Sequence, residues 1–118
     1  MNLKGKSVLV TGAGGFIGSH LVEELISKGA VVTCFIKYNS RNNWGFIEDF
    51  DADSKNKIKI IRGDLRDSEI IKNAMKGIDC VFHLAALIAI PYSYTNPKEN
   101  FEINVLGTYN VMQAALDN

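Results

Sequence analysis

The sequence predicts an α/β fold in which helices cover both faces of a parallel sheet. Short apolar runs alternate with segments of helical periodicity along the 118 residues, and three of the four runs expected to be strands are almost continuously apolar. Strands that are buried on both faces have this composition, because each face packs against helices. A chain of this length is typical of one domain with one hydrophobic core.

The first half of the chain carries the clearest alternation. Residues 7–11 form a β-rich run, and residues 17–28 repeat apolar side chains at helical spacing until Gly29 ends the helix. Residues 30–36 are expected to form a second strand. The polar, Asn-rich stretch 37–53 is expected to hold a loop and one short helix.

The second half continues the pattern with two more strands. Residues 57–61 are expected to form the third strand, and a helix capped by its first residue is expected over 67–75. Residues 79–84 are expected to form the fourth strand. Pro91 marks a connection, and a last helix is expected over 97–116, because proline suits the first turn of a helix.

Composition and charge exclude several classes of function. The 13 basic and 13 acidic residues balance, so no net charge indicates a nucleic-acid partner or an anionic membrane surface. The longest apolar run, residues 80–91, is shorter than the roughly 20 residues that cross a bilayer. Cys34 and Cys80 lack metal-ligand spacing and are expected to be free, buried thiols. Without a signal-peptide pattern, the chain is expected to be cytoplasmic, with no metal, membrane or nucleic-acid partner.

A glycine-rich turn joins the first strand to the first helix. Gly12 permits the tight turn, Gly15 lets the backbone approach a pyrophosphate, and Gly18 allows the helix to pack closely on the sheet. The phosphates would meet the N–H groups and the positive dipole end of the helix. The turn, with Phe16 and Ile17 in its second half, therefore predicts a dinucleotide-binding site.

The residues of this turn resemble a known family. The stretch 11–21, Thr-Gly-x-x-Gly-Phe-Ile-Gly-Ser-His-Leu once the variable positions are marked x, resembles the extended short-chain dehydrogenase/reductases that act on nucleotide sugars. The resemblance continues in the motifs at 63–67, 83–86 and 104–110, which occur in the family's order and cover the chain. It implies a Rossmann-type doubly wound parallel sheet with strand order 3-2-1-4, truncated after about four strands.

The resemblance also implies roles for individual residues. Asp64 and Leu65 would contact the adenine, although a turn or helix-capping role is the alternative for the aspartate. Asn104 would line the cofactor cleft and help to hold the active-site helix, or else be a satisfied polar residue on a packed helix. Three small or apolar residues after the fourth strand would lie against the cofactor's ribose and phosphates: Leu84, Ala85 and Ala86.

The choice between NAD and NADP depends on the residues after the second strand. Family members that prefer NAD carry an aspartate at the position that is Ile36 here, and Lys37, Ser40 and Arg41 follow it. This basic loop resembles that of the NADP-dependent GDP-mannose dehydratases, so NADP is favoured over NAD. Asn39 remains an alternative partner for a ribose hydroxyl of NAD.

No catalytic residue is assigned. The family oxidises a sugar with a Ser/Thr, a Tyr and a Lys, the last two standing four residues apart on a helix after the fifth strand. Tyr94 and Lys98 have that spacing, but Pro97 lies between them and the pair precedes Asn104 instead of following it. His83 is expected to be structural, because it lies in an apolar strand with no acidic residue beside it.

The resemblance implies that residues 1–118 are the N-terminal NAD(P)-binding portion of a longer enzyme whose catalytic and substrate portion is absent. The stretches 38–45 and 88–93 resemble the nucleotide-sugar 4,6-dehydratases, which remove a hydride at sugar C4 and then eliminate water. A 4-epimerase and a non-catalytic NAD(P)-binding regulatory protein are the alternatives. The 118-residue chain is expected to be inactive by itself, and a nucleotide sugar would be the substrate of the full-length enzyme.

The chain is also expected to form a homodimer. The fourth strand would be a bare sheet edge without proline, lysine or a bulge to protect it. The last helix would expose Val105, Val111 and Met112. Antiparallel pairing of two fourth strands or contact between last helices would bury these surfaces.

Overall fold

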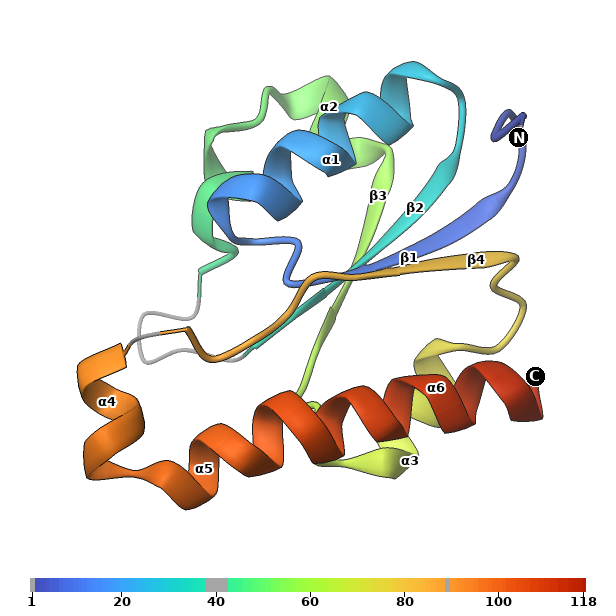
Figure 1. The fold of residues 1–118 in the computed structure, drawn as a ribbon. Coiled ribbons are helices and arrows are strands. Elements are labelled where there is room, and N and C mark those ends of the chain that lie inside the picture. Colours follow the sequence, from blue (N-terminus) through green and yellow to red (C-terminus); the bar gives the residue numbers. More distant parts are fainter. Residues whose placement is uncertain (1, 38–42, 89) are drawn as a thin grey trace.

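The protein is described by a computed structural model over residues 2–37, 43–88 and 90–118. Four parallel strands form one sheet in the order β3-β2-β1-β4, which confirms the predicted order. The chain therefore runs outward from β1 to β3 and then crosses back to place β4 on the other side of β1 (Figure 1). The strands are β1 (Ser7–Thr11), β2 (Val31–Ile36), β3 (Ile58–Arg62) and β4 (Cys80–His83).

Side chains of β1 alternate between two buried clusters, one on each face of the sheet. Val8 and Val10 pack in the cluster that includes α1 residues, and Leu9 packs in the cluster that includes residues of α3 and α6. All three are fully buried. A strand that is covered on both faces needs apolar side chains at consecutive positions, which explains the continuous apolar run.

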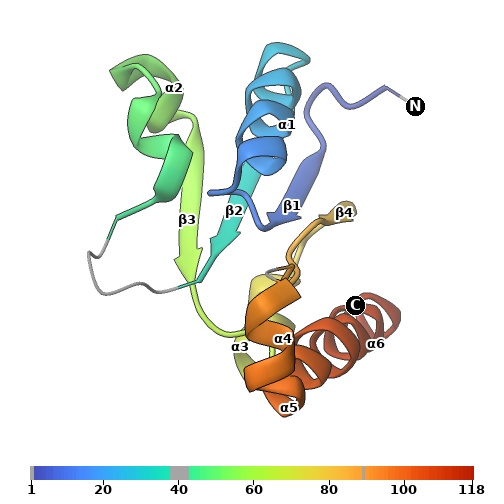
Figure 2. The ribbon, with the colours of Figure 1, turned by 60° about the vertical axis from the view of Figure 1, so that its left-hand side comes forward.

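The helices form a layer on each side of the sheet (Figures 1 and 2). One layer holds α1 (Phe16–Ser27), the 3₁₀-helical turn η1 (Gly45–Asp49) and α2 (Ala52–Asn56). The other holds α3 (Ser68–Ala74), α5 (Pro97–Phe101), the π-helical segment η2 (Glu102–Leu106) and α6 (Gly107–Asp117). The short helix α4 (Ile90–Thr95) stands at the end of the second layer, beyond the carboxyl end of β4.

The structure differs from the sequence prediction at Pro91 and agrees with it at Pro97. Pro91 lies inside α4 and not in an irregular connection, because a proline is tolerated in the first turn of a helix. The break before Pro97 is confirmed: Asn96 has φ −139° and ψ 67°, and its side chain caps α5. The stretch expected to hold one short helix contains both η1 and α2.

The last helix is continuous from α5 through η2 to α6, close to the predicted bounds. Val105 and Met112 are exposed as expected, but Val111 is buried, so that part of the prediction is wrong. Val111 belongs to the cluster formed with α3 and the sheet, because it lies on the side of α6 that faces them.

Both cysteines are free, as predicted, but their burial differs. Cys34 on β2 is buried, and burial raises its pKa to about 12. Cys80 is only half-buried, because β4 is an outer strand of the sheet. Within the described ranges, no group of three or more His, Cys, Asp or Glu side chains is arranged to hold a metal ion. In the same ranges, none of the helices combines the length and the apolar character needed to cross a membrane.

Candidate functional site

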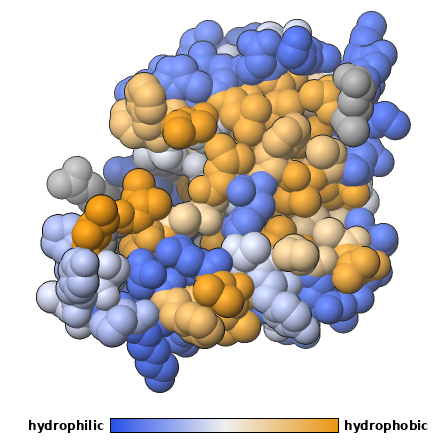
Figure 3. Space-filling model, viewed as in Figure 1, coloured by the Kyte–Doolittle hydropathy of each residue, from blue (hydrophilic) through white to orange (hydrophobic). Residues whose placement is uncertain are grey.

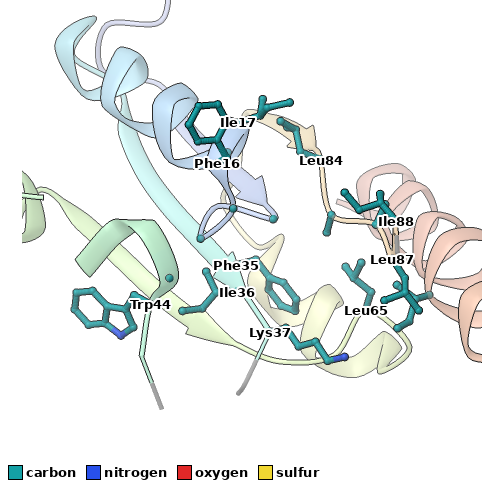
Figure 4. Close-up of a pocket in the computed structure, with 18 of the residues that line it drawn as sticks. Phe16, Ile17, Phe35, Ile36, Lys37, Trp44, Leu65, Leu84, Leu87 and Ile88 are labelled. Carbon is teal, nitrogen blue, oxygen red and sulfur yellow. The ribbon is translucent and has the colours of Figure 1, made fainter. Parts of the chain in front are cut away.

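A pocket of about 710 Å³ opens where β1, β2 and β4 end. The strand order reverses at β1, and ligands of open α/β sheets bind at such a point. The close-up shows side chains around the pocket from the start of α1, from the end of β2 and from the loop after β4 (Figure 4). Most of the labelled side chains are apolar, so polar recognition depends on a few groups and on the backbone.

The glycine turn forms one wall of this pocket with all five of its predicted binding residues: Gly12, Gly15, Phe16, Ile17 and Gly18. A Cβ on Gly18 would overlap the carbonyl oxygen of Gly12, so the helix reaches this position only without a side chain. Gly12 has φ +69°, and a Cβ there would lie 2.9 Å from the Ala85 nitrogen. These contacts explain the tight turn and the close packing of helix on sheet.

The N-terminus of α1 faces this pocket, and no side chain of the helix neutralises its positive dipole end. Gly15 is the N-cap and makes no side-chain cap hydrogen bond, and the first turn carries no acidic residue. The free N–H groups and positive dipole end of a 12-residue helix are thus available to an anion. The residues present therefore fit a dinucleotide pyrophosphate, which requires close backbone approach and N–H donors.

Sequence reasoning missed a second contact of the glycine turn, with the segment around Trp44. The Phe46 N–H donates to the Gly14 carbonyl at 2.9 Å, and a Cβ on Gly14 would lie 2.8 Å from the Trp44 oxygen. Gly45 has φ +67°, and a Cβ there would overlap the Gly14 carbonyl oxygen. Trp44 thereby becomes a lining residue, and no local pattern in the sequence indicated this contact.

A hydrogen-bond network holds the loop after β4 against the glycine turn. The Thr11 hydroxyl oxygen accepts from the N–H groups of Leu84, at 3.1 Å, and Ala85, at 3.2 Å. Leu84, Ala85 and Ala86, which the sequence predicted to contact the cofactor, all line the pocket. Thr11 thus holds this loop by hydrogen bonds but does not line the pocket itself.

His83 completes the network through both of its ring nitrogens. Its Nε2 lies 2.9 Å from the Thr108 hydroxyl, which donates to the Asn104 carbonyl, so Nε2–H is the donor to Thr108. Its Nδ1 lies 2.7 Å from the Thr11 hydroxyl and accepts that proton. Burial lowers the pKa of His83, and the network likewise suits the neutral ring.

Asp64 and Leu65 lie at the far side of the pocket, after β3. The Arg66 guanidinium donates to both carboxylate oxygens of Asp64, with a shortest distance of 2.6 Å. This hydrogen bond is the main reason that the pKa of Asp64 is lowered. The Asp64 carboxylate thus stabilises its own turn, which is the alternative role that the sequence left open. The residue also borders the pocket.

Asn104 does not line the pocket, but it forms hydrogen bonds with the loop that does. Its Oδ1 accepts from the Leu87 N–H at 2.7 Å, and its Nδ2 donates to the Leu87 carbonyl at 3.0 Å. Asn100 donates to the same carbonyl at 3.1 Å. The structure therefore places Asn104 as a satisfied polar residue that fixes a lining loop, and its expected position in the cleft is not observed.

The residues proposed to select the cofactor are only partly described. Lys37 lines the pocket directly after β2, and Figure 4 shows its side chain extending toward Leu65. Ser40 and Arg41 lie outside the described residues. Tyr94 and Lys98 belong to different helices, α4 and α5, so the break expected between them is present.

Comparisons with known proteins agree with this geometry. Residues 9–118 match the family model described as GDP-mannose 4,6 dehydratase. The chain is 35% identical over 124 residues to a UDP-glucose 4-epimerase of Rickettsia typhi, covering 96% of this chain and 33% of that protein. The chain thus spans about a third of the length of the curated relatives it matches.

Two solved structures are similar over almost the whole chain. Pen from Bacillus thuringiensis matches with a TM-score of 0.89 and 33% identity, covering 99% of this chain and 36% of that one. The UDP-glucose 4-epimerase of Thermus thermophilus, solved in complex with NAD, matches with a TM-score of 0.76 and 33% identity, covering 94% and 34%. This chain therefore shares its Rossmann-type fold with these two proteins.

Proposed function

The chain belongs to the GDP-mannose 4,6-dehydratase family of nucleotide-sugar enzymes, and from that premise we propose that residues 1–118 are the NAD(P)-binding portion of a nucleotide-sugar 4,6-dehydratase. The glycine turn carries this proposal. Gly12 and Gly18 allow the Ala85 and Gly12 backbone to pack where a side chain would collide, and the uncapped start of α1 offers N–H groups to a pyrophosphate.

The proposed binding residues follow the walls of the pocket. Gly12, Gly15 and Gly18, with the N-terminus of α1, hold the pyrophosphate. Asp64 and Leu65 border the adenine. Phe16, Ile17 and the loop 84–86 enclose the ribose and phosphates, and Asn104 keeps that loop in place through Leu87. When bound, the nicotinamide accepts a hydride from the substrate.

NADP is the preferred cofactor in this proposal. Ile36 stands where a carboxylate would bind the ribose hydroxyls of NAD, and the cation Lys37 follows it at the mouth of the pocket. Ser40 and Arg41 extend this basic loop in the sequence. The Thermus thermophilus relative holds NAD, so the preference is a property proposed for this chain and not for its family.

A nucleotide-sugar 4-epimerase is the second candidate. It is supported by the Rickettsia typhi relative, which is named as an epimerase. Both reactions begin with oxidation of a nucleotide sugar at C4, so the dinucleotide portion serves either one. A regulatory NAD(P)-binding protein is the non-catalytic alternative. In each case we propose a cytoplasmic protein.

Calorimetric titration with NADP and NAD tests the proposed cofactor site. We expect the wild type to bind both and to favour NADP, and Lys37→Asp to reverse that preference. Lys28→Asp, which reverses an exposed charge at the end of α1, is the matched control and should bind like the wild type. Absence of binding to either cofactor refutes the site, and an NAD preference that survives Lys37→Asp refutes the role of Lys37.

Incubation with a panel of nucleotide sugars tests the expectation that the 118-residue chain is inactive. We expect no turnover above background in the presence of NADP, because no Tyr–Lys pair shares one helix face in the described residues. Turnover that Tyr94→Phe abolishes would contradict the exclusion of Tyr94 and Lys98.

A further inference from the structure

The side chain of Lys37 is paired with a carboxylate from a distant element. Its Nζ lies 3.9 Å from Oε1 of Glu99, a residue in the first turn of α5. The Lys37 side chain is 62% exposed, whereas that of Glu99 is only 21% exposed. The carboxylate is therefore the more enclosed member of this pair, and the lysine is the more exposed one.

Glu99 is held in place by hydrogen bonds to its other carboxylate oxygen. The Tyr92 hydroxyl donates to Oε2 at 2.5 Å, and the Asn96 Nδ2 donates to it at 3.0 Å. In return, the Glu99 N–H donates to the Asn96 side chain and closes the start of α5. These bonds leave Oε1 directed at Lys37, and the bond to Glu99 also raises the pKa of Tyr92.

Further charged side chains surround this pair. The Asp64–Arg66 pair lies on the same side of the pocket, and its hydrogen bond is the main cause of the lowered pKa of Asp64, with Lys37 lowering it further. The hydrogen bond with Asp64 is the main cause of the raised pKa of Arg66, and Glu102 and then Glu99 raise it further. Two cations, Lys37 and Arg66, therefore lie among three carboxylates, those of Asp64, Glu99 and Glu102, and Glu99 is the one that pairs with Lys37.

We propose that Glu99 is a specificity-determining residue of the dinucleotide site. Its carboxylate weakens binding of a 2′-phosphate because it neutralises Lys37. The inference rests on the proposed function. A 2′-phosphate brings up to two negative charges to the ribose that Lys37 would recognise, whereas the 2′-hydroxyl of NAD brings none. A fixed carboxylate about 4 Å from that lysine therefore opposes NADP selectively. The preference for NADP is accordingly small in the wild type.

Fragments of the cofactor that contain only the adenosine end provide the sharpest test. We expect Glu99→Gln to tighten binding of adenosine 2′,5′-bisphosphate about two- to fivefold, because the charge that it removes acts on a solvent-screened lysine. Binding of adenosine 5′-monophosphate should change less than twofold. Glutamine retains an acceptor for Tyr92, so the start of α5 keeps its hydrogen bond. Calorimetry gives the affinities, and the fluorescence of Trp44, the one tryptophan of the chain, gives a second readout.

Two controls separate the possible outcomes. Glu24→Gln removes the same charge from an exposed pair with Lys28 on α1 and should leave both affinities unchanged. In a Lys37→Gln background, Glu99→Gln should lose most of its effect, because there is no lysine left to neutralise. Equal gains for both fragments, no gain for the bisphosphate, or an undiminished gain without Lys37 would each overturn the proposal. If the wild type binds neither fragment, the proposed function itself fails.

Discussion

Gly18 shows how strongly one residue can constrain the site. Alanine has the higher helix propensity by about 1 kcal/mol, so the exchange would stabilise an ordinary helix. Here the new Cβ would overlap the Gly12 carbonyl oxygen and lie 2.8 Å from its carbon. Both are backbone atoms of a tight turn, so they cannot move as a flexible side chain would. Steric repulsion therefore outweighs helix propensity.

We predict that Gly18→Ala lowers the free energy of unfolding by about 3 kcal/mol, as severe overpacking does, and abolishes dinucleotide binding. Urea denaturation and calorimetric titration measure the two effects. Gly77→Asn is the control, because a Cβ there meets no atom within 4 Å and asparagine tolerates the observed φ of +73°. A Gly18→Ala protein as stable as the wild type would contradict the close contact.

His83 predicts a specific pH dependence of stability. Its pKa in the folded chain is lowered by burial from the ordinary 6.5, so the unfolded chain takes up the proton first as the pH falls. The free energy of unfolding should be level above about pH 7.5 and should fall below pH 6.5, by at most about 1.4 kcal/mol per pH unit. The loss ends once the folded chain is also protonated.

Thermal or urea unfolding between pH 5 and pH 8 measures this slope. His83→Gln should flatten it, even though the variant also loses hydrogen bonds to Thr11 and Thr108. His20→Gln removes the exposed histidine of α1 and should leave the slope unchanged. An unchanged slope in His83→Gln would assign the pH dependence to another group.

At the scale of elements, α6 is attached to the turn after β3 by one buried amide. The Asn110 Nδ2 donates to the Leu65 carbonyl at 2.8 Å, and both residues are buried. Gly107 lies one turn earlier, where a Cβ would meet the Leu65 side chain at 2.8 Å. The helix and the turn that borders the proposed adenine site are thus held at close range.

We predict that Asn110→Ala lowers the free energy of unfolding by about 1–2 kcal/mol, because the Leu65 carbonyl loses its buried donor. Urea denaturation measures the loss. Gln113→Ala, on the same helix, removes an exposed bond to Asp117 and should change stability by less than about 0.5 kcal/mol. Equal effects of the two variants would show that burial of the bond is unimportant.

At the scale of the whole molecule, one face is unusually apolar. Figure 3 shows hydrophobic side chains gathered in the middle of the face on which Figure 1 draws β4. Within the described residues, β4 pairs with β1 alone. An exposed stripe of large apolar side chains also follows the last helix: Phe101, Val105, Tyr109, Met112 and Leu116. Surfaces of this kind favour association.

We predict that a polypeptide of these 118 residues self-associates at micromolar concentration, which light scattering measures. The Asp79 N–H donates to Ser7 of β1, so the alternation of a parallel ladder directs the Phe82 N–H to the open edge. Phe82→Pro should therefore weaken pairing of β4 with a second copy, whereas Met112→Glu should weaken association through the helix stripe. A monomeric wild type would contradict the prediction, and circular dichroism checks that each variant folds.

Much of the fold was predictable from the sequence because its determinants are local. Hydrophobic periodicity and turn glycines set the order and the approximate bounds of the strands and of α1, α3 and the last helix. The helix α4 was not predicted, since Pro91 fits a first turn as well as a connection. The buried position of Val111 also depends on which side of α6 meets α3.

The sequence by itself determined the glycine turn, the parallel sheet and the family to which the chain belongs, because these depend on residue type and short-range spacing. Only the tertiary structure brought Glu99 to Lys37, and the Trp44 segment to Gly14. It likewise decided that His83 forms hydrogen bonds with two threonines. Asn104 binds the backbone of Leu87 and does not line the pocket. These contacts join segments distant in the chain that meet only because parallel strands end at the same edge of the sheet.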